Sequence, residues 1–314
     1  MRYYFAPLEG LTDSVYRRLH HKYFPGIHRY YTPFFSPTVH RALTPRETRE
    51  LPPASTLSYS CVPQLLTKVP ADFLWMAEQC RDLGYDEVNL NLGCPSGTVT
   101  AKGKGAGMLT DLQSLDRFLD EVFSAAPLDI SIKTRLGFHS AEEFPALLDI
   151  FNCYPVKELI VHPRVRQDFY SAQVDLEHFT YALQNSKSPV CYNGNLCSKE
   201  QILKFAEQFP QVGSVMVGRG LIGDPGMFAP GGTTVSSLSA FYGELFEEYR
   251  VIFGSSRNAM FRLKENWRYL LRHFENSEKL GKRLRKAKDP DEYSAITREI
   301  FDSLPMLPEL VADW

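Results

Sequence analysis

The chain has 314 residues, of which 44% are hydrophobic, and its formal net charge is −2. This length allows one large core with a small appendage, and the lack of an 18-residue apolar run argues against a membrane span. Six cysteines without a CxxC pair argue against a disulfide scaffold and against a metal site. We expect a cytoplasmic protein, because the thiols fit a reducing compartment and no signal-peptide segment precedes the first predicted strand.

Apolar runs alternate with segments of helical spacing over the first two thirds of the chain. The runs predict eight strands: Tyr3–Ala6, Ile27–Tyr31, Cys61–Leu66, Glu87–Leu92, Asp129–Arg135, Glu158–His162, Pro189–Tyr192 and Ser214–Gly218. The clearest helices between them are Asp72–Leu83, Leu112–Phe123 and Ser198–Phe209. Eight βα units predict an α/β fold of the TIM (β/α)8 barrel type. A doubly wound sheet is the competing architecture, but no G-x-G-x-x-G follows the first strand.

The barrel pattern ends in a segment rich in proline and glycine, and apolar helical spacing follows it. We therefore predict a barrel domain over residues 1–229, a linker over 230–237 and a helical domain over 238–314. Between Arg257 and Lys288 there are eleven Lys or Arg residues and three Glu, a surplus of +8 that leaves −10 for the remainder. This localised basic block indicates either a surface that binds RNA or a solvated helix face.

A cysteine follows the predicted strand Glu87–Leu92. Because Gly93-Cys94-Pro95 continues neither a strand nor a helix, Cys94 is expected in a loop at a strand's carboxyl end, where α/β barrels build active sites. Beyond it, residues 97–107 hold four glycines and two lysines and predict a flexible, basic loop. Cys94 is thus a candidate for proton or nucleophile chemistry, and the alternative is a small buried cysteine before a tight turn.

Polar residues also follow the other predicted strands. The amide of Gln64 can donate to and accept from a heterocycle edge, and Lys133 and Arg135 place two cations on one face of the fifth strand. Further candidates at strand ends are His162, Asn193-Gly194-Asn195 and Gly218-Arg219. The loops after strands seven and eight commonly bind phosphate in this barrel. Each of these residues alone is a weak signal, but the presence of polar residues at the ends of several strands favours an active site at the barrel mouth.

The same positions resemble the tRNA-dihydrouridine synthases, flavin enzymes that reduce a uridine within tRNA. The matching residues are Ala6-Pro7-Leu8-Glu9-Gly10-Leu11-Thr12-Asp13, Gln64, Asn91-Leu92-Gly93-Cys94-Pro95, Lys133-Thr134-Arg135, His162, Arg164, Tyr170, Asn193-Gly194-Asn195 and Val217-Gly218-Arg219-Gly220. The resemblance covers the whole barrel in order and extends weakly to Arg262-Leu263-Lys264, Trp267 and Tyr269. Asn195, Pro163 and Val165 differ from the acidic residue, glycine and threonine that are usual in the family.

The resemblance implies that FMN lies at the barrel mouth, that NADPH is the reductant and that tRNA is the partner. It assigns the cofactor to Pro7, Leu8, Glu9, Gln64, Lys133, His162, Asn193, Gly194, Asn195, Gly218 and Arg219. Of these, Lys133 would stabilise the negative charge near N1 of reduced flavin. The uracil, flipped out of the tRNA, would be held by Asn91, Arg135 and Tyr170. Hydride would reach C6 of the uracil, and Cys94 would protonate C5.

Two other functions stay open at this point. An FMN-dependent reductase of a free pyrimidine, of the dihydroorotate dehydrogenase kind, also combines a barrel with a loop cysteine. Such an enzyme does not require a basic helical appendage, so the positive charge between Arg257 and Lys288 argues against this function. A non-catalytic RNA-binding protein built on a barrel is the second alternative, and the joint presence of Cys94, Lys133 and His162 argues against it.

Overall fold

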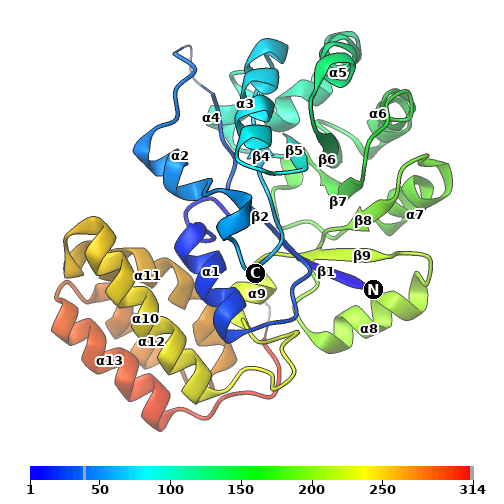
Figure 1. Ribbon diagram of the computed structural model, residues 1–314. Coiled ribbons are helices and arrows are strands. Elements are labelled where there is room, and N and C mark those ends of the chain that lie inside the picture. The colour runs from blue at the N-terminus through cyan, green and yellow to red at the C-terminus, as the bar shows by residue number, and fades with distance from the viewer. Residues whose placement is uncertain (38–39, 312–314) are drawn as a thin grey trace.

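The strands of the protein form one parallel sheet at the centre of the molecule (Figure 1). The computed structural model describes residues 1–37 and 40–311. Its strands are β1 (Arg2–Phe5), β2 (Arg29–Tyr31), β3 (Cys61–Val62), β4 (Gln64–Leu65), β5 (Glu87–Leu92), β6 (Asp129–Gly137), β7 (Leu159–Val165), β8 (Val190–Tyr192) and β9 (Ser214–Val217). Their order is β3-β2-β1-β9-β8-β7-β6-β5-β4.

The third predicted strand, Cys61–Leu66, is divided at Pro63 into β3 and β4. Proline has no N–H to donate, so it interrupts a ladder of strand hydrogen bonds. The first half pairs with β2 and the second half pairs with β5, so this one segment joins the two ends of the sheet. The predicted TIM barrel is confirmed, and the doubly wound sheet is wrong.

Helices surround the barrel in the order that the sequence predicts (Figure 1). They are α1 (Ser14–Tyr23), α2 (Pro45–Glu50), α3 (Pro70–Asp82), α4 (Gly97–Thr100), α5 (Leu112–Ala125), α6 (Phe144–Phe151), α7 (Leu176–Asn185), α8 (Lys199–Gln208) and α9 (Arg219–Gly223). Short 3-10 turns are η1 (Ala54–Thr56), η2 (Gly105–Thr110), η3 (Ala141–Glu143), η4 (Arg166–Asp168) and η5 (Leu271–His273). The predicted helix Ser198–Phe209 corresponds to α8, which Ser198 caps: its hydroxyl accepts from the backbone N–H of Gln201.

The barrel interior is apolar in the middle and polar at both ends. Its apolar layer consists of Tyr4, Ala6, Tyr31, Val62, Ile160, Cys191 and Met216. At the amino end, the buried carboxylates of Glu87 and Glu158 face cations: Glu87 lies 2.9 Å from Arg29, and Glu158 lies 3.5 Å from Arg2. Buried carboxylates persist when they are paired in this way, so this end is closed. The carboxyl end is therefore the open end.

Four longer helices follow the barrel: α10 (Val235–Phe253), α11 (Ser256–Leu270), α12 (Glu278–Lys286) and α13 (Pro290–Ser303). Thr234 caps α10 through the N–H of Ser237, so helical structure begins inside the predicted linker. The prediction of helix to the end of the chain is wrong, because residues 304–311 leave the helical path and Met306 bridges to Phe274. Residues 312–314 lie outside the described residues, and the predicted domain boundaries stay a prediction. None of the described helices is long and apolar enough to cross a membrane.

Of these helices, α10 packs against α1, and α11 contacts α9 and the loop after β1, whereas α12 and α13 pack on α11 (Figure 1). The ring of Phe241 contacts Tyr16 and Phe24 edge-on, at centroid distances of 5.3 Å. Arg262 of α11 donates to the carbonyl of Gly10 and lies 2.6 Å from the carboxylate of Asp13. Both charged side chains are partly buried, which strengthens their attraction. One cation of the basic block is therefore used inside the protein rather than on an outer surface.

We predict that Arg262→Ala lowers the free energy of unfolding by about 2 kcal/mol, because it leaves a partly buried carboxylate without its partner. Urea denaturation measures this change. Arg283→Ala is the matched control, since Arg283 pairs with Glu299 at 2.8 Å with both side chains about half exposed, and exposed pairs contribute little. Equal effects of the two substitutions would show that Arg262 does not fasten the helices to the barrel.

Candidate active site

The carboxyl ends of the strands surround a cavity of about 700 Å³. Every residue that the sequence assigns to the site lines it: Pro7, Leu8, Glu9, Gln64, Asn91, Cys94, Lys133, Arg135, His162, Tyr170, Asn193, Gly194, Asn195, Gly218 and Arg219. Parallel strands end at the same rim, so residues far apart in sequence meet there. Their individual roles stay predictions. Sequence analysis did not assign Phe34, Phe169, Arg268, Tyr269 and Arg272 to this cavity, although all of them line it.

The carboxamide of Asn91 fixes the turn that carries Cys94. Its Oδ1 accepts from the backbone N–H of Gly93 at 3.1 Å and from that of Cys94 at 2.9 Å. Asn91 in turn donates from Nδ2 to Gln64 Oε1 at 2.7 Å, and Gln64 donates to Asn89 at 2.8 Å. These amides point into the barrel, because alternate residues of a strand face the same side. Gln64 and Asn91 thus have a structural task in addition to the contacts predicted for them.

The segment after Cys94 is more ordered than the sequence suggests. Residues 97–107 include α4 and the start of η2, and residues 105–109 are buried, so the predicted flexible loop is wrong. Ala106 donates its N–H to the carbonyl of Cys94 at 3.2 Å. At Gly105, where φ is +57°, an added Cβ would lie 3.0 Å from the Cβ of Cys94. Gly105 therefore serves close packing against the cysteine, and Gly107 packs in the same way against Thr100, where an added Cβ would lie 2.9 Å from the carbonyl oxygen.

Burial raises the pKa of the Cys94 thiol, and the nearby charges of Arg135 and Lys133 offset this only in part. A cysteine with a raised pKa carries its proton at neutral pH. The site therefore favours a thiol that donates a proton over a thiolate that attacks as a nucleophile.

Lys133 lies beside Asn91, since the two residues are register partners in β5 and β6. Burial lowers the pKa of Lys133 to about 8, and the neighbouring charge of Arg135 acts in the same direction. Within the described part of the chain, the ammonium has neither a hydrogen-bond acceptor nor a carboxylate partner. Lys133 is half-buried at the wall of the cavity, and a partly desolvated cation of this kind is stabilised by an anionic ligand.

Arg135 of β6 ties together the loop after β5 and the segment at the end of β7. Its guanidinium donates to the carbonyls of Gly93 at 2.8 Å, Val165 at 3.0 Å and Phe169 at 2.8 Å. The ring of Tyr170 lies between two cations, with its centroid 5.5 Å from Arg135 and 5.3 Å from Arg219. The loop that carries the predicted uracil-binding Tyr170 is thus held by the same residue that holds the cysteine turn.

His162 is neutral in this site. Burial and the surrounding charges of Arg135 and Lys133 hold its pKa well below the usual value. Its Nε2 lies 2.9 Å from Arg164 Nη1. Arginine can only donate, so Nε2 accepts and the ring proton resides on Nδ1. His162 can therefore act as a hydrogen-bond donor through Nδ1.

The loops after β8 and β9 meet through Asn195 and Arg219. The Oδ1 of Asn195 accepts from Arg219 Nη2 at 3.1 Å, and Asn195 adopts a φ of +39°. Asn193 donates to the carbonyl of Met216 at 2.7 Å. A Cβ added at Gly194 would lie 2.9 Å from the hydroxyl of Tyr192. The amide of Asn195, which stands where the family usually has an acid, orients Arg219 without neutralising its charge.

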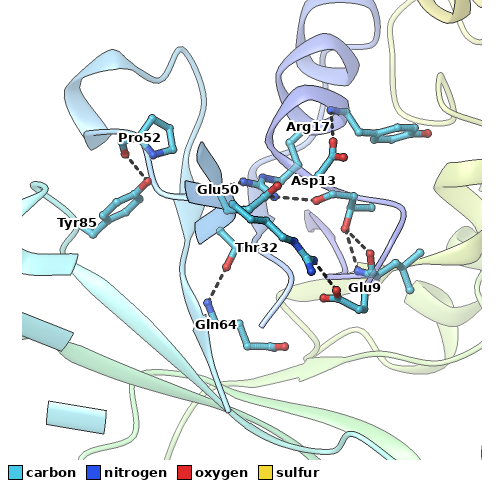
Figure 2. A network of polar contacts seen from close by, with 12 residues as sticks. Glu9, Asp13, Arg17, Thr32, Glu50, Pro52, Gln64 and Tyr85 are labelled. Atoms are coloured by element: carbon cyan, nitrogen blue, oxygen red, sulfur yellow. Dashed lines mark hydrogen bonds and ion pairs between the residues drawn. The ribbon is translucent and has the colours of Figure 1, made fainter. Parts of the chain in front are cut away.

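On the opposite wall, an ion-pair network positions Glu9 (Figure 2). Glu9 pairs with Arg46 of α2. A second pair, between the buried Arg17 and Glu50 at 3.0 Å, holds α2 against α1. Beside these ion pairs, the backbone N–H of Gln64 donates a hydrogen bond to Thr32 Oγ1 at 2.9 Å. The loop after β2 is thus fixed where Phe34 lines the cavity.

The cavity as a whole is basic. Among the described residues that line it, the cations are Lys133, Arg135, Arg219, Arg268 and Arg272, whereas Glu9 is the carboxylate. Because Glu9 already pairs with Arg46, the remaining field attracts an anion. In the described ranges 1–37 and 40–311, no cluster of His, Cys, Asp and Glu could hold a metal ion.

Comparison with known proteins places this site in a family. The family model described as "Dihydrouridine synthase (Dus)" matches residues 4–287. The chain belongs to the dihydrouridine synthase family. The match extends through α10, α11 and α12, so this family's members share the helical part as well as the barrel.

Individual relatives agree with the family model. The chain is 30% identical over 247 residues to "tRNA-dihydrouridine(16) synthase" of Shigella flexneri, covering 72% of this chain and 74% of that protein. It is 27% identical over 228 residues to "Probable tRNA-dihydrouridine synthase 1" of Synechocystis sp., covering 70% of this chain and 61% of that protein. The alignment thus spans less than two thirds of the Synechocystis relative.

Among solved structures, a complex of morphinone reductase with tetrahydroNAD superposes with a TM-score of 0.50 at 11% sequence identity. The superposition covers 72% of this chain and 85% of that one. At this identity the likeness concerns the barrel fold alone.

Proposed function

We propose that the protein is a tRNA-dihydrouridine synthase, which uses FMN and NADPH to reduce the C5–C6 double bond of a uridine in tRNA. Membership of the dihydrouridine synthase family and the similarity to proteins named tRNA-dihydrouridine synthases support this reaction. The observation that carries the proposal is that one basic cavity contains both a protonated thiol, Cys94, and a cation without an ion-pair partner among the described residues, Lys133. A free-pyrimidine reductase does not account for the basic helices that the family model includes.

The residues of the cavity fit a flavin mononucleotide in charge and in space. Lys133 offers an unpaired ammonium for an electron-rich ring, and Arg219 offers a planar guanidinium for a phosphate. Glycine at positions 194 and 218 leaves room beside the walls, since a Cβ at Gly218 would lie 3.4 Å from Ala6. When bound, the flavin would supply the hydride that reduces C6 of the uracil ring.

The chain's own residues then account for the proton. Cys94 holds a proton on its sulfur at neutral pH and would donate it to C5 of the uracil. Asn91 and Arg135 keep the thiol in place by binding the backbone of the Gly93–Cys94 turn. Tyr170, between Arg135 and Arg219, would face the ring of the extruded base.

The basic block divides into groups with different tasks. Arg262 and Lys264 bond to the protein itself, the latter to the carbonyls of Arg285 and Ala287 at 2.7 Å. Arg268, which is exposed, and Arg272 line the cavity. On α12 and just beyond it, the exposed cations are Lys279, Lys282, Arg283, Arg285, Lys286 and Lys288. We propose that this α12 surface binds tRNA phosphates.

The central test is Cys94→Ala. This variant should keep FMN and its reduction by NADPH, yet lose dihydrouridine formation by about 10²- to 10⁴-fold, because only the proton donor is missing. Mass spectrometry of nucleosides from an unmodified tRNA transcript measures the product. Cys153→Ala, which removes an exposed thiol, should be fully active. Parent-level product from Cys94→Ala would exclude Cys94 as the acid.

Lys133 should make FMN binding dependent on pH. Its ammonium is present below a pKa of about 8, and an anionic ligand prefers that form. FMN affinity should therefore fall as pH rises above 8 in the parent. Lys133→Ala should bind at least about tenfold more weakly at pH 7, without this pH dependence. Lys133→Arg should stay charged and bind independently of pH up to about 10.

Flavin fluorescence quenching measures these affinities. Lys204→Ala is the control, because Lys204 is an exposed lysine that pairs with Glu200 on α8. A Lys133→Ala variant with the parent's affinity at pH 7 would remove Lys133 from the cofactor site.

Reversal of charge on α12 should weaken tRNA binding. Lys279, Lys282 and Lys286 are exposed there, and replacing all three by Glu should raise the tRNA dissociation constant and flatten its dependence on salt. FMN binding should not change, since these residues lie outside the lining of the cavity. The matched control reverses three exposed lysines elsewhere, Lys187, Lys199 and Lys204. Equal tRNA affinity and salt slope in both triple variants would place the RNA surface elsewhere.

A further inference from the structure

A phenylalanine at the rim of the cavity has no part in the chemistry proposed above. Phe169 directly follows η4, lines the cavity and is 44% exposed. Its neighbour Tyr170 is 46% exposed and contacts His162, whose ring stacks at a centroid distance of 6.1 Å, and the guanidinium groups of Arg135 and Arg219. Phe169 is therefore a second exposed aromatic ring on this loop, beside the one proposed to face the extruded uracil.

The ring of Phe169 is supported from one side. The guanidinium carbon of Arg166 lies 5.2 Å from the ring centroid of Phe169 and 5.4 Å from that of Phe138. Arg166 itself reaches Thr100 in α4, where its Nη2 donates at 3.4 Å. Because the guanidinium lies over one face of Phe169, the exposed area is on the other face and the ring edge. An aromatic face backed by a cation suits a planar, electron-rich group.

The backbone of Phe169 is held in an unfavourable conformation. Its φ is +49°, a value that L-residues rarely adopt. Its carbonyl accepts from Arg135 Nη2 at 2.8 Å, and its N–H donates to the carbonyl of Arg166 at 3.3 Å. Such strain persists where surrounding contacts impose it, and it is common at ligand clamps. The protein therefore fixes the direction of this ring relative to Arg135, which also binds the cysteine turn.

We propose that Phe169 is a stacking platform for the nucleobase next to the uridine that is reduced. This inference rests on the proposed function. A uridine that reaches Cys94 must leave its stack, and its neighbour then loses a stacking partner. Phe169 lies on the rim of the same cavity and can replace that partner. The contact does not select a base, because every base has a π face.

The test combines protein variants with altered RNA. Phe169→Ala keeps a Cβ, and with it the backbone constraint at φ +49°, but removes the ring. It should raise KM for an unmodified tRNA transcript about tenfold, whereas Phe169→Tyr should stay near the parent. Transcripts with an abasic residue on the 5′ or the 3′ side of the reduced uridine form the second arm. One of these two abasic transcripts should raise the KM of the parent enzyme about as much as Phe169→Ala does with the intact transcript. The same abasic transcript should not raise the KM of Phe169→Ala any further.

The other outcomes are distinguishable. If the effects of Phe169→Ala and of the abasic residue on KM are additive, the stacking contact is overturned while the proposed function stands. The same holds if the parent has equal KM for the intact transcript and for both abasic transcripts. A parent that forms no dihydrouridine overturns the proposed function and this inference together.

Phe253→Ala is the matched control, because this phenyl ring of α10 is 39% exposed and is not among the described residues that line the cavity. Phe169→Leu, which keeps apolar volume without a π face, should behave like Phe169→Ala.

Discussion

The guanidinium of Arg135 is the interaction on which the geometry of this site depends. One planar group donates to three carbonyls in two segments: that of Gly93 after β5, and those of Val165 and Phe169 at and after the end of β7. Its fork of donors is rigid, so the bonds fix the segments relative to one another as well as to β6. The thiol of Cys94 and the aromatic loop at Phe169 and Tyr170 are therefore set by the same side chain.

Burying this much positive charge has a consequence for the other groups. Burial and Arg135 together lower the pKa of Lys133 to about 8 and hold His162 neutral. The same burial keeps the proton on Cys94. Each group is thus brought to the protonation state that its proposed role requires: a cation that can still lose its charge, a neutral donor and an acid. An anion in the cavity relieves the repulsion among the cations, which couples ligand binding to the stability of the site.

The helical part contributes to the site as well as to a surface. Arg262 fastens α11 to the loop after β1 through Gly10 and Asp13. That attachment brings Arg268 and Arg272, at the end of the same helix and in η5, to the cavity. The barrel mouth is therefore completed by a segment outside the barrel. The exposed cations on α12 are not among the described residues that line the cavity, which separates residues that serve the cavity from those proposed to serve tRNA.

The sequence by itself determined the order of the eight strands, the helical end of the chain and the set of residues at the strand ends. It could do so because periodicity and turn residues are local signals, and because the carboxyl ends of parallel strands must share one rim. The tertiary structure decided the rest. The glycines of residues 97–107 indicate flexibility until the close packing of Gly105 against Cys94 and of Gly107 against Thr100 is known. Arg268 and Arg272 could be read as surface charge until the docking of α11 placed them in the cavity. Whether a glycine gives freedom or close approach, and whether a cation meets water or a ligand, depends on neighbours distant in sequence, which no local pattern specifies.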